Sequence, residues 1–205
     1  MKLAQTSQLD SAAEQGLQKL IEGNQRFMRG EARFPTVCKE TLADLARGQR
    51  PFATILGCSD SRVPPELIFD ANFGELFIVR VAGNVISPEV MGSLQYAGAH
   101  LRTPLFVVLG HEGCGAVRAA LETKLGGKEH RLLIQTLVDN ILPGLADVGS
   151  HLSEEERLSI AVEANVRWSI HQVLETPEGQ NAMEAGIRLV GAVYEIASGH
   201  VRLLS

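Results

Sequence analysis

Three short apolar runs constrain the fold of this chain more than any other feature of its sequence. They are FATILG at residues 52–57, LFIVRVAG at 76–83 and LFVVLG at 105–110, and each ends near a glycine. Short runs of β-branched and aromatic residues without polar alternation are typical of strands that are buried on both faces of a parallel sheet. The three runs therefore predict a central, mainly parallel β-sheet.

Segments with helical spacing of apolar residues lie before, between and after these runs, which predicts an α/β fold with helices flanking the sheet. The final segment, residues 186–204, instead alternates apolar and polar residues and contains SGH, which predicts a hairpin. The expected helices are residues 9–30, 39–48, 87–101, 113–125, 130–148 and 153–175.

One of these segments has two local features that bear on packing. Residues 153–175 begin with SEEE, a serine cap followed by acidic residues, which is typical of a helix start. Further along, one helical face combines apolar residues with a tryptophan and an asparagine, so we expect this face to pack in the core or in an interface. The face consists of Ala161, Val162, Asn165, Val166 and Trp168.

Length and composition narrow the class of protein. The chain has 205 residues, of which 45% are hydrophobic and 21% charged, and its net charge is −5. We expect a single domain over residues 1–205, with a helical arm at 1–48 and an α/β core at 49–205. The sequence has neither a basic stripe nor a long apolar run. These features predict no nucleic-acid partner, no membrane association and a cytoplasmic location.

A cysteine and a Cys–His pair follow two of the predicted strands. Cys58 comes directly after the first run, while His111 and Cys114 follow the third within GHEGCGA. In open parallel sheets the ligand site lies at the carboxyl ends of the strands, so adjacent strands would bring these side chains together. Thiolate and imidazole ligands suit Zn²⁺, and three protein ligands with one open position are typical of a catalytic site.

Asp60 and Arg62 lie close to Cys58 and leave two interpretations open. The Asp60 carboxylate could ligate the metal and close the site. Alternatively, the Arg62 guanidinium could hold the carboxylate in a bidentate pair and leave room for water. A loop salt bridge that only shapes the turn is compatible with either arrangement.

At these residues the chain resembles the β-class carbonic anhydrases. The resemblance covers at least residues 17–121, and its motifs are long and specific. They occur in the family's order and spacing: LIEGNQRF, GQRPF, CSDSRV, FIVRVAGN, SLQYAGAHL and VVLGHEGCGAV.

The resemblance implies reversible hydration of CO2 to bicarbonate and a proton. It places one Zn²⁺ per subunit on Cys58, His111 and Cys114. Asp60, paired with Arg62, would orient a zinc-bound hydroxide and would ligate zinc only in a closed form. The alternatives are hydrolysis of carbonyl sulfide or carbon disulfide on the same fold, and a non-catalytic zinc module. The latter usually has four fixed ligands with paired C-x2-C spacing, which the sequence lacks.

The resemblance also implies a substrate pocket and a partner. Gln49 matches a glutamine that helps bind bicarbonate, commonly from the partner subunit. Phe77 and Ala82 fall where the family lines an apolar pocket for CO2, and Tyr96 is expected to contribute to the same wall. The expected assembly is a homodimer or a dimer of dimers, with the N-terminal helices lying over the partner.

One departure from the family concerns regulation. A subclass carries a tryptophan three residues before the first cysteine, as part of a non-catalytic bicarbonate site. In this chain that position is Ile55, whereas the arginine and tyrosine of the site would fall on Arg80 and Tyr194. We therefore expect this regulatory site to be absent or altered.

Overall fold

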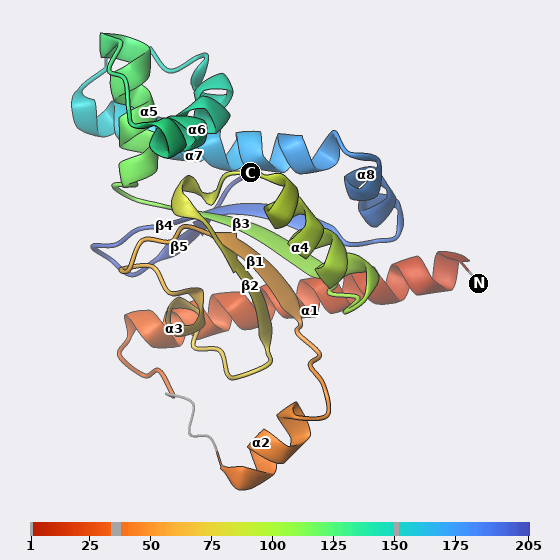
Figure 1. Ribbon diagram of the computed structural model, residues 1–205. Helices are drawn as coiled ribbons and strands as arrows, with labels where there is room; N and C mark the ends of the chain where they lie inside the picture. Colours follow the sequence, from red (N-terminus) through yellow and green to blue (C-terminus); the bar gives the residue numbers. More distant parts are fainter. Residues whose placement is uncertain (1, 34–37, 150–151) are drawn as a thin grey trace.

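The computed structural model describes residues 2–33, 38–149 and 152–205, and it contains a five-stranded sheet with the order β2-β1-β3-β4-β5 (Figure 1). The strands β1 to β4 are parallel, and β5 pairs antiparallel with β4. The predicted mainly parallel sheet and the C-terminal hairpin are therefore confirmed. The strands are β1 Ala53–Gly57, β2 Leu76–Arg80, β3 Leu105–His111, β4 Arg188–Tyr194 and β5 Val201–Leu203.

The register of the parallel strands aligns their carboxyl ends. Gly57, the last residue of β1, lies opposite Arg80 in β2 and Leu109 in β3. Every residue of β1 and β3 is buried, whereas β2 at the sheet edge is half-buried. The unbroken apolar character of the first and third runs therefore reflects their central place in the sheet.

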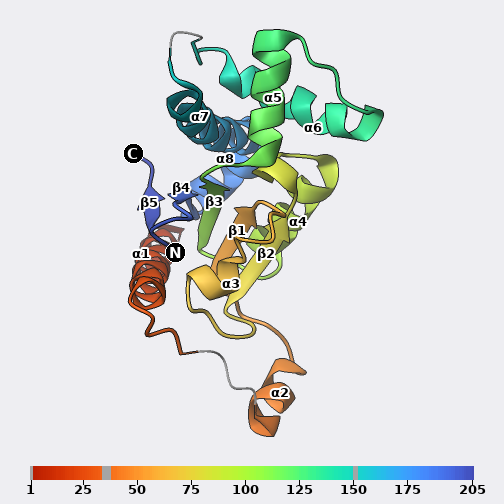
Figure 2. The ribbon, with the colours of Figure 1, turned by 90° about the vertical axis from the view of Figure 1, so that its left-hand side faces the viewer.

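Helices cover both faces of the sheet, with α1 on one face and α4 and α7 on the other (Figure 2). Alternate residues of β3 show this division, because Leu105 lies beside Gly16 of α1 and Phe106 beside Gly98 of α4. No described helix is long and apolar enough to cross a bilayer. The helices are α1 Lys2–Met28, α2 Lys39–Leu45, α3 Pro65–Ile68, η1 Ala82–Asn84, α4 Pro88–Ala99, α5 Gly115–Gly126, α6 Leu132–Ile141, η2 Leu142–Leu145, α7 Glu154–Leu174 and α8 Pro177–Glu184.

Two helices begin with a serine cap, and the cap of α7 is the one that the sequence predicts. The Ser87 side chain accepts a hydrogen bond from the backbone N–H of Val90, and Pro88 occupies the first turn of α4. Ser153 and Glu156 form a reciprocal capping box at the start of α7. The helices α3 and α8 and the turn η1 were not predicted. The elements α3 and η1 are too short to show a periodic pattern, and α8 has the sequence PEGQNAME, with few apolar residues.

The two N-terminal helices differ in how they meet the rest of the chain. One face of α1 buries Ala13, Leu17 and Leu20 in the core, so this helix is part of the chain's own fold. In contrast, α2 has no buried residue and stands away from the sheet (Figure 1). Packing of residues 1–48 on a partner stays a prediction. Such packing would give α2 the buried contacts that it lacks in the single chain.

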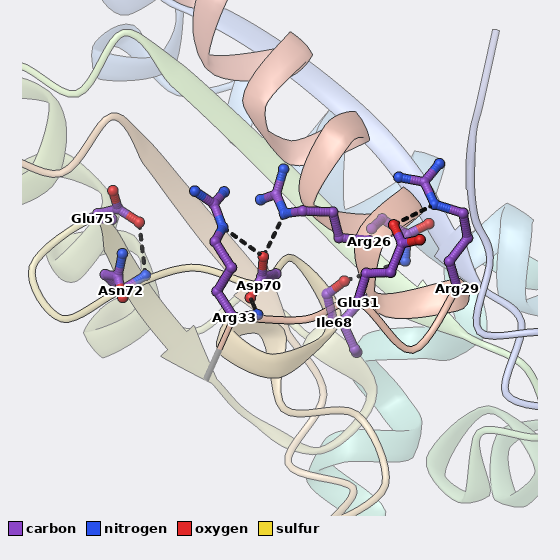
Figure 3. Close-up of polar contacts among 9 residues, drawn as sticks. Arg26, Arg29, Glu31, Arg33, Ile68, Asp70, Asn72 and Glu75 are labelled. Atoms are coloured by element: carbon purple, nitrogen blue, oxygen red, sulfur yellow. Dashed lines mark hydrogen bonds and ion pairs between the residues drawn. The ribbon is translucent and has the colours of Figure 1, made fainter. Parts of the chain in front are cut away.

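An ion-pair cluster around the buried carboxylate of Asp70 fastens the end of α1 to the loop between α3 and β2 (Figure 3). The side chain of Asp70 is 3% exposed and accepts from Arg26 Nε at 2.5 Å and from Arg33 Nε at 3.3 Å. It also accepts from the backbone N–H of Arg33 at 2.7 Å. Burial by itself raises the pKa of Asp70, but the hydrogen bonds from Arg26 and Arg33 outweigh it and lower the pKa below its ordinary value.

We expect Asp70→Asn to lower the free energy of unfolding at neutral pH by about 2 kcal/mol, because it removes a charged hydrogen-bond acceptor. Asparagine is a suitable replacement because it tolerates the left-handed φ of 44° at this position. Since the folded pKa is lowered, the contribution is complete above the ordinary aspartate pKa of about 3.9 and is lost as the pH falls toward the folded value.

The measurement is urea unfolding of both proteins at neutral and acidic pH, where the difference should shrink on acidification. The matched control is Glu31→Gln, which breaks the exposed pair with Arg29 and should change stability by less than about 0.5 kcal/mol. An equal loss in the two variants would contradict the role given to Asp70.

Candidate metal centre

Three side chains from two adjacent strand ends converge on one point. Cys58 follows β1, His111 ends β3, and Cys114 is the N-cap residue of α5. All three are buried, and their potential ligand atoms lie within 4.8 Å of one another. The aligned carboxyl ends of β1 and β3 thus bring together residues that are far apart in sequence, as the sequence predicts.

The hydrogen bonding of the two His111 ring nitrogens shows whether this cluster fits a metal ion. Its Nδ1 lies 2.9 Å from the carbonyl oxygen of Glu112 and donates to it, which leaves Nε2 as an acceptor. Nε2 is buried and has no hydrogen-bond partner among the described residues. A buried nitrogen without a donor is unfavourable, and a cation held with the two thiolates would satisfy it. The donor set therefore fits Zn²⁺.

The two thiols shift each other's pKa in opposite directions. A hydrogen bond from Cys114 lowers the pKa of Cys58, against the effect of burial. The pKa of Cys114 is raised, first by its interaction with Cys58 and second by burial. In the chain alone the pair therefore favours one thiolate and one thiol, and a cation between them would favour both thiolates.

Asp60 and Arg62 form a bidentate ion pair beside the cluster. Arg62 donates from Nε to Asp60 Oδ1 at 3.0 Å and from a terminal guanidinium nitrogen to Oδ2 at 2.8 Å, and its backbone N–H donates to Oδ1 at 3.0 Å. The Arg62 hydrogen bonds hold the pKa of Asp60 well below its usual range. Asp60 Oδ2 lies 3.9 Å from Nε2 of His111, so the carboxylate faces the cluster.

Arg80 holds the loop that carries both Cys58 and Asp60. Its Nε donates to the carbonyl of Cys58 at 2.8 Å, and a terminal nitrogen donates to the carbonyl of Asp60 at 2.6 Å. This arginine therefore has a local structural role.

Ile55 is fully buried and Tyr194 is nearly so, and the absence of the regulatory bicarbonate site stays a prediction.

The residues expected around the substrate fall into two groups. Ala82 begins η1 and lies next to Gly83, whose backbone N–H donates to Cys58 Sγ at 3.3 Å. The rings of Phe77 in β2 and Tyr96 in α4 lie 6.1 Å apart, but Phe77 is in the amino half of its strand. Gln49 precedes β1, so a five-residue strand, about 16 Å long, separates it from the cluster.

Sequence reasoning did not predict two residues of α7 that hydrogen-bond to the turn beside Cys58. Asn165 and Ser169 are fully buried and hydrogen-bond to the turn η1 that contacts Cys58. The available signal was an asparagine within an otherwise apolar helical face. Trp168 lies against Gly144 in η2 and donates from Nε1 to the carbonyl of Asn140, in agreement with the expected core or interface packing.

Comparisons with known proteins agree with this site. A family model described as carbonic anhydrase matches residues 53–201. Carbonic anhydrase 2 of Mycobacterium tuberculosis is 37% identical over 188 residues, which cover 90% of this chain and 89% of that protein. The carbonic anhydrase of Mycolicibacterium smegmatis is 36% identical over 191 residues, covering 91% of this chain and 90% of that protein.

Solved structures extend the likeness to the fold. The β-carbonic anhydrase CafA of Aspergillus fumigatus matches with a TM-score of 0.74 and 31% identity, covering 81% of each chain. One of two tetrameric β-carbonic anhydrases of Sordaria macrospora matches with a TM-score of 0.71 and 27% identity, covering 80% of this chain and 85% of that one. The chain therefore belongs to the β-class carbonic anhydrases, lyases that hydrate CO2.

We expect Cys58→Ser to weaken zinc binding by more than about 100-fold, because loss of an outer hydrogen-bond partner alone costs up to that much. The measurement is competition with a chromogenic chelator, together with zinc content after dialysis. Cys38→Ser is the matched control, since Cys38 is exposed and its sulfur contacts Thr41. Retention of one zinc per chain in the Cys58 variant would remove this residue from the ligand set.

Proposed function

We propose that this carbonic anhydrase hydrates CO2 with Zn²⁺ held by Cys58, His111 and Cys114, and with Asp60 and Arg62 orienting the attacking water. The single observation that carries the proposal is the bidentate Asp60–Arg62 pair, which faces a buried Cys–His–Cys cluster at the strand ends. An isolated structural zinc module would have no use for such a pair.

The metal and the carboxylate have separate tasks in this proposal. Zn²⁺, when bound, acts as a Lewis acid that lowers the pKa of water to about 7, a magnitude taken from carbonic anhydrases with another ligand set. An ionised carboxylate has about four acceptor positions, and Arg62 occupies three of them. The remaining position is on Oδ2, the oxygen that faces His111, and it accepts a hydrogen bond from the attacking water.

The Arg62 pair also bears on whether Asp60 closes the site. Both carboxylate oxygens are held by Arg62, which supports the open arrangement in which Asp60 is not a ligand. Coordination by Asp60 would use the acceptor position that Arg62 leaves free on Oδ2, so the same position could not also accept a hydrogen bond from the attacking water. The closed form is therefore an alternative to the oriented water.

The edge of the sheet supports a homodimer as the active form. The edge strand β2 pairs with β1 alone among the described strands, and it is apolar along most of its length. Phe73, shortly before β2 in the chain, and Tyr96, beside Phe77 of β2, are exposed large hydrophobic residues. Exposed apolar edge strands are templates for pairing with another chain. Antiparallel pairing of β2 with its copy would set the amino half of one strand beside the carboxyl half of the other.

Such pairing would complete the substrate site. Gln49 precedes β1, Phe77 lies near the amino end of β2, and Tyr96 of α4 lies beside Phe77, so all three are on the side of the sheet away from the cluster of their own chain. Across a two-fold axis the same residues would approach the cluster of the partner subunit. CO2 is apolar and would bind against Phe77 and Ala82, while the Gln49 amide would bind the polar oxygens of bicarbonate. A dimer of dimers is compatible with this arrangement, and the matched Sordaria enzymes are tetrameric.

The cytoplasmic location and the lack of a nucleic-acid or membrane partner stay predictions from composition.

We expect Asp60→Asn and Arg62→Ala to retain zinc and to lower CO2 hydration by about 100-fold or more, because each removes the oriented acceptor. The measurement is stopped-flow hydration with a pH indicator, combined with metal content. Asp44→Asn is the matched control, because Asp44 is paired with Arg47 in an exposed pair on α2. Turnover at the wild-type level in both dyad variants would contradict the mechanism.

The same preparations separate this reaction from its rivals. Carbonyl sulfide and carbon disulfide should be tested in parallel with CO2 on the wild-type protein. Faster turnover of either sulfur compound would favour the hydrolase alternative. Zinc binding without turnover of any of the three compounds would favour the non-catalytic module.

We expect inactive Gln49→Ala and Asp60→Asn variants to complement each other when mixed. If Gln49 acts on the partner's cluster, hybrid dimers contain one site with both residues intact. Random reassociation should then restore about a quarter of wild-type activity. The measurement is CO2 hydration after the two variants are unfolded together and refolded, with each variant refolded alone as the control. No recovery, with hybrids confirmed by native mass spectrometry, would place Gln49 in its own subunit's site.

A further inference from the structure

The turn η1 places a backbone amide against a metal-ligand sulfur. Gly83 N donates to Cys58 Sγ at 3.3 Å, and both residues are buried. The orientation of this N–H depends on an unusual backbone, because Gly83 and Asn84 have φ values of 70° and 45°. Glycine adopts this conformation readily, whereas a non-glycine residue such as Asn84 does so at a cost of about 1 kcal/mol. The turn therefore needs contacts that hold it.

Two polar side chains of α7 supply these contacts. Asn165 Nδ2 donates to the carbonyl of Gly83 at 2.8 Å, and Ser169 Oγ donates to the carbonyl of Asn84 at 3.0 Å. The Asn84 side chain donates in return to Ser169 Oγ at 3.4 Å. Both carbonyls of the left-handed residues thus have a buried donor on one face of one helix.

These polar residues are not required merely to attach α7 to the sheet. Val162 and Val166 already lie beside Gly110 in β3, and Ile170 lies beside Gly191 in β4. Apolar side chains at positions 165 and 169 would extend that contact, since burying polar groups is favourable only when they are hydrogen-bonded. The asparagine and serine therefore have a specific task at the turn.

We propose that Asn165 and Ser169 are positioning residues for the metal centre: they hold η1 in its left-handed conformation, so that Gly83 N–H donates to Cys58 Sγ. A hydrogen bond withdraws electron density from a thiolate ligand. Two thiolates donate more charge to a metal than imidazoles do, and the Gly83 amide partly offsets this at Cys58. The inference deepens the proposed function and rests on its assignment of Cys58 as a metal ligand.

The test uses the full-length protein loaded with Co²⁺ in place of zinc, because thiolate-to-cobalt charge transfer reports electron density on sulfur. In Asn165→Leu and Ser169→Ala the absorption band should move to longer wavelength, and more in Asn165→Leu, which removes the donor to Gly83 itself. In the metal-free protein, the Gly83 amide hydrogen should exchange faster with solvent in both variants, as measured by NMR.

Val173→Ala is the matched control, because it removes buried volume from α7 near α8 and away from the turn. It should lower the free energy of unfolding and leave both the band and the Gly83 exchange rate unchanged. If Asn165→Leu does not fold, Ser169→Ala decides the question, since it removes one hydroxyl and little volume. Wild-type band positions and Gly83 exchange rates in the folded α7 variants would overturn the proposal.

The outcomes also separate this inference from the proposed reaction. A wild-type protein that shows the thiolate band but does not hydrate CO2 would refute the reaction and leave the positioning role standing. A wild-type protein that hydrates CO2, with α7 variants unchanged in both spectra, would refute the positioning role alone. A wild-type protein without any thiolate-to-cobalt band would refute Cys58 as a ligand and the inference with it.

Discussion

The parallel pairing of β1 with β3 is the constraint on which the rest of the site depends. It fixes Cys58 and His111 at the same edge of the sheet, and Cys114 follows as α5 begins. A shift of one residue between these strands would turn one ligand to the opposite face of the sheet. The complete burial of both strands prevents such a shift, because alternate apolar residues must meet α1 on one side and α4 and α7 on the other. Core packing of β1 and β3 thus helps to specify where the Cys–His–Cys cluster lies.

Around the cluster, main-chain groups make many of the hydrogen bonds that orient the side chains. The Glu112 carbonyl orients the His111 ring, and the Gly83 amide donates to the Cys58 sulfur. Arg80 donates to two carbonyls of the loop that follows β1. Side chains with a direct part in the proposed reaction are few, and Asp60 is the most constrained of them. Its two oxygens are held by one arginine from the same loop, so its geometry depends little on distant movements.

The sequence predicted the parts of the structure that leave a local pattern. Apolar runs marked β1, β2 and β3, a serine cap marked the start of α7, and the spacing of Cys58, His111 and Cys114 marked the cluster. The turn η1 and its link to α7 could not be predicted, because they depend on contacts between residues 83 and 165 that no periodicity reveals. The separation of Gln49 from Cys58 already followed from the predicted strand at 52–57, and the structure confirms that strand. In contrast, the amphipathic pattern of the N-terminal helix did not reveal that α1 packs on the chain's own sheet.

The hydrogen bond at His111 has a consequence for how the family can vary. The acceptor that fixes the tautomer of the His111 imidazole is the main-chain carbonyl of residue 112 and not a carboxylate side chain. Every amino acid carries that carbonyl, so mutation at position 112 leaves the tautomer of His111 intact. The side chain at this position is therefore free to serve the hairpin instead, and Glu112 does so by accepting a hydrogen bond from the backbone N–H of Ile196. Substitution at position 112 can therefore change the surface beside the site without changing the orientation of His111.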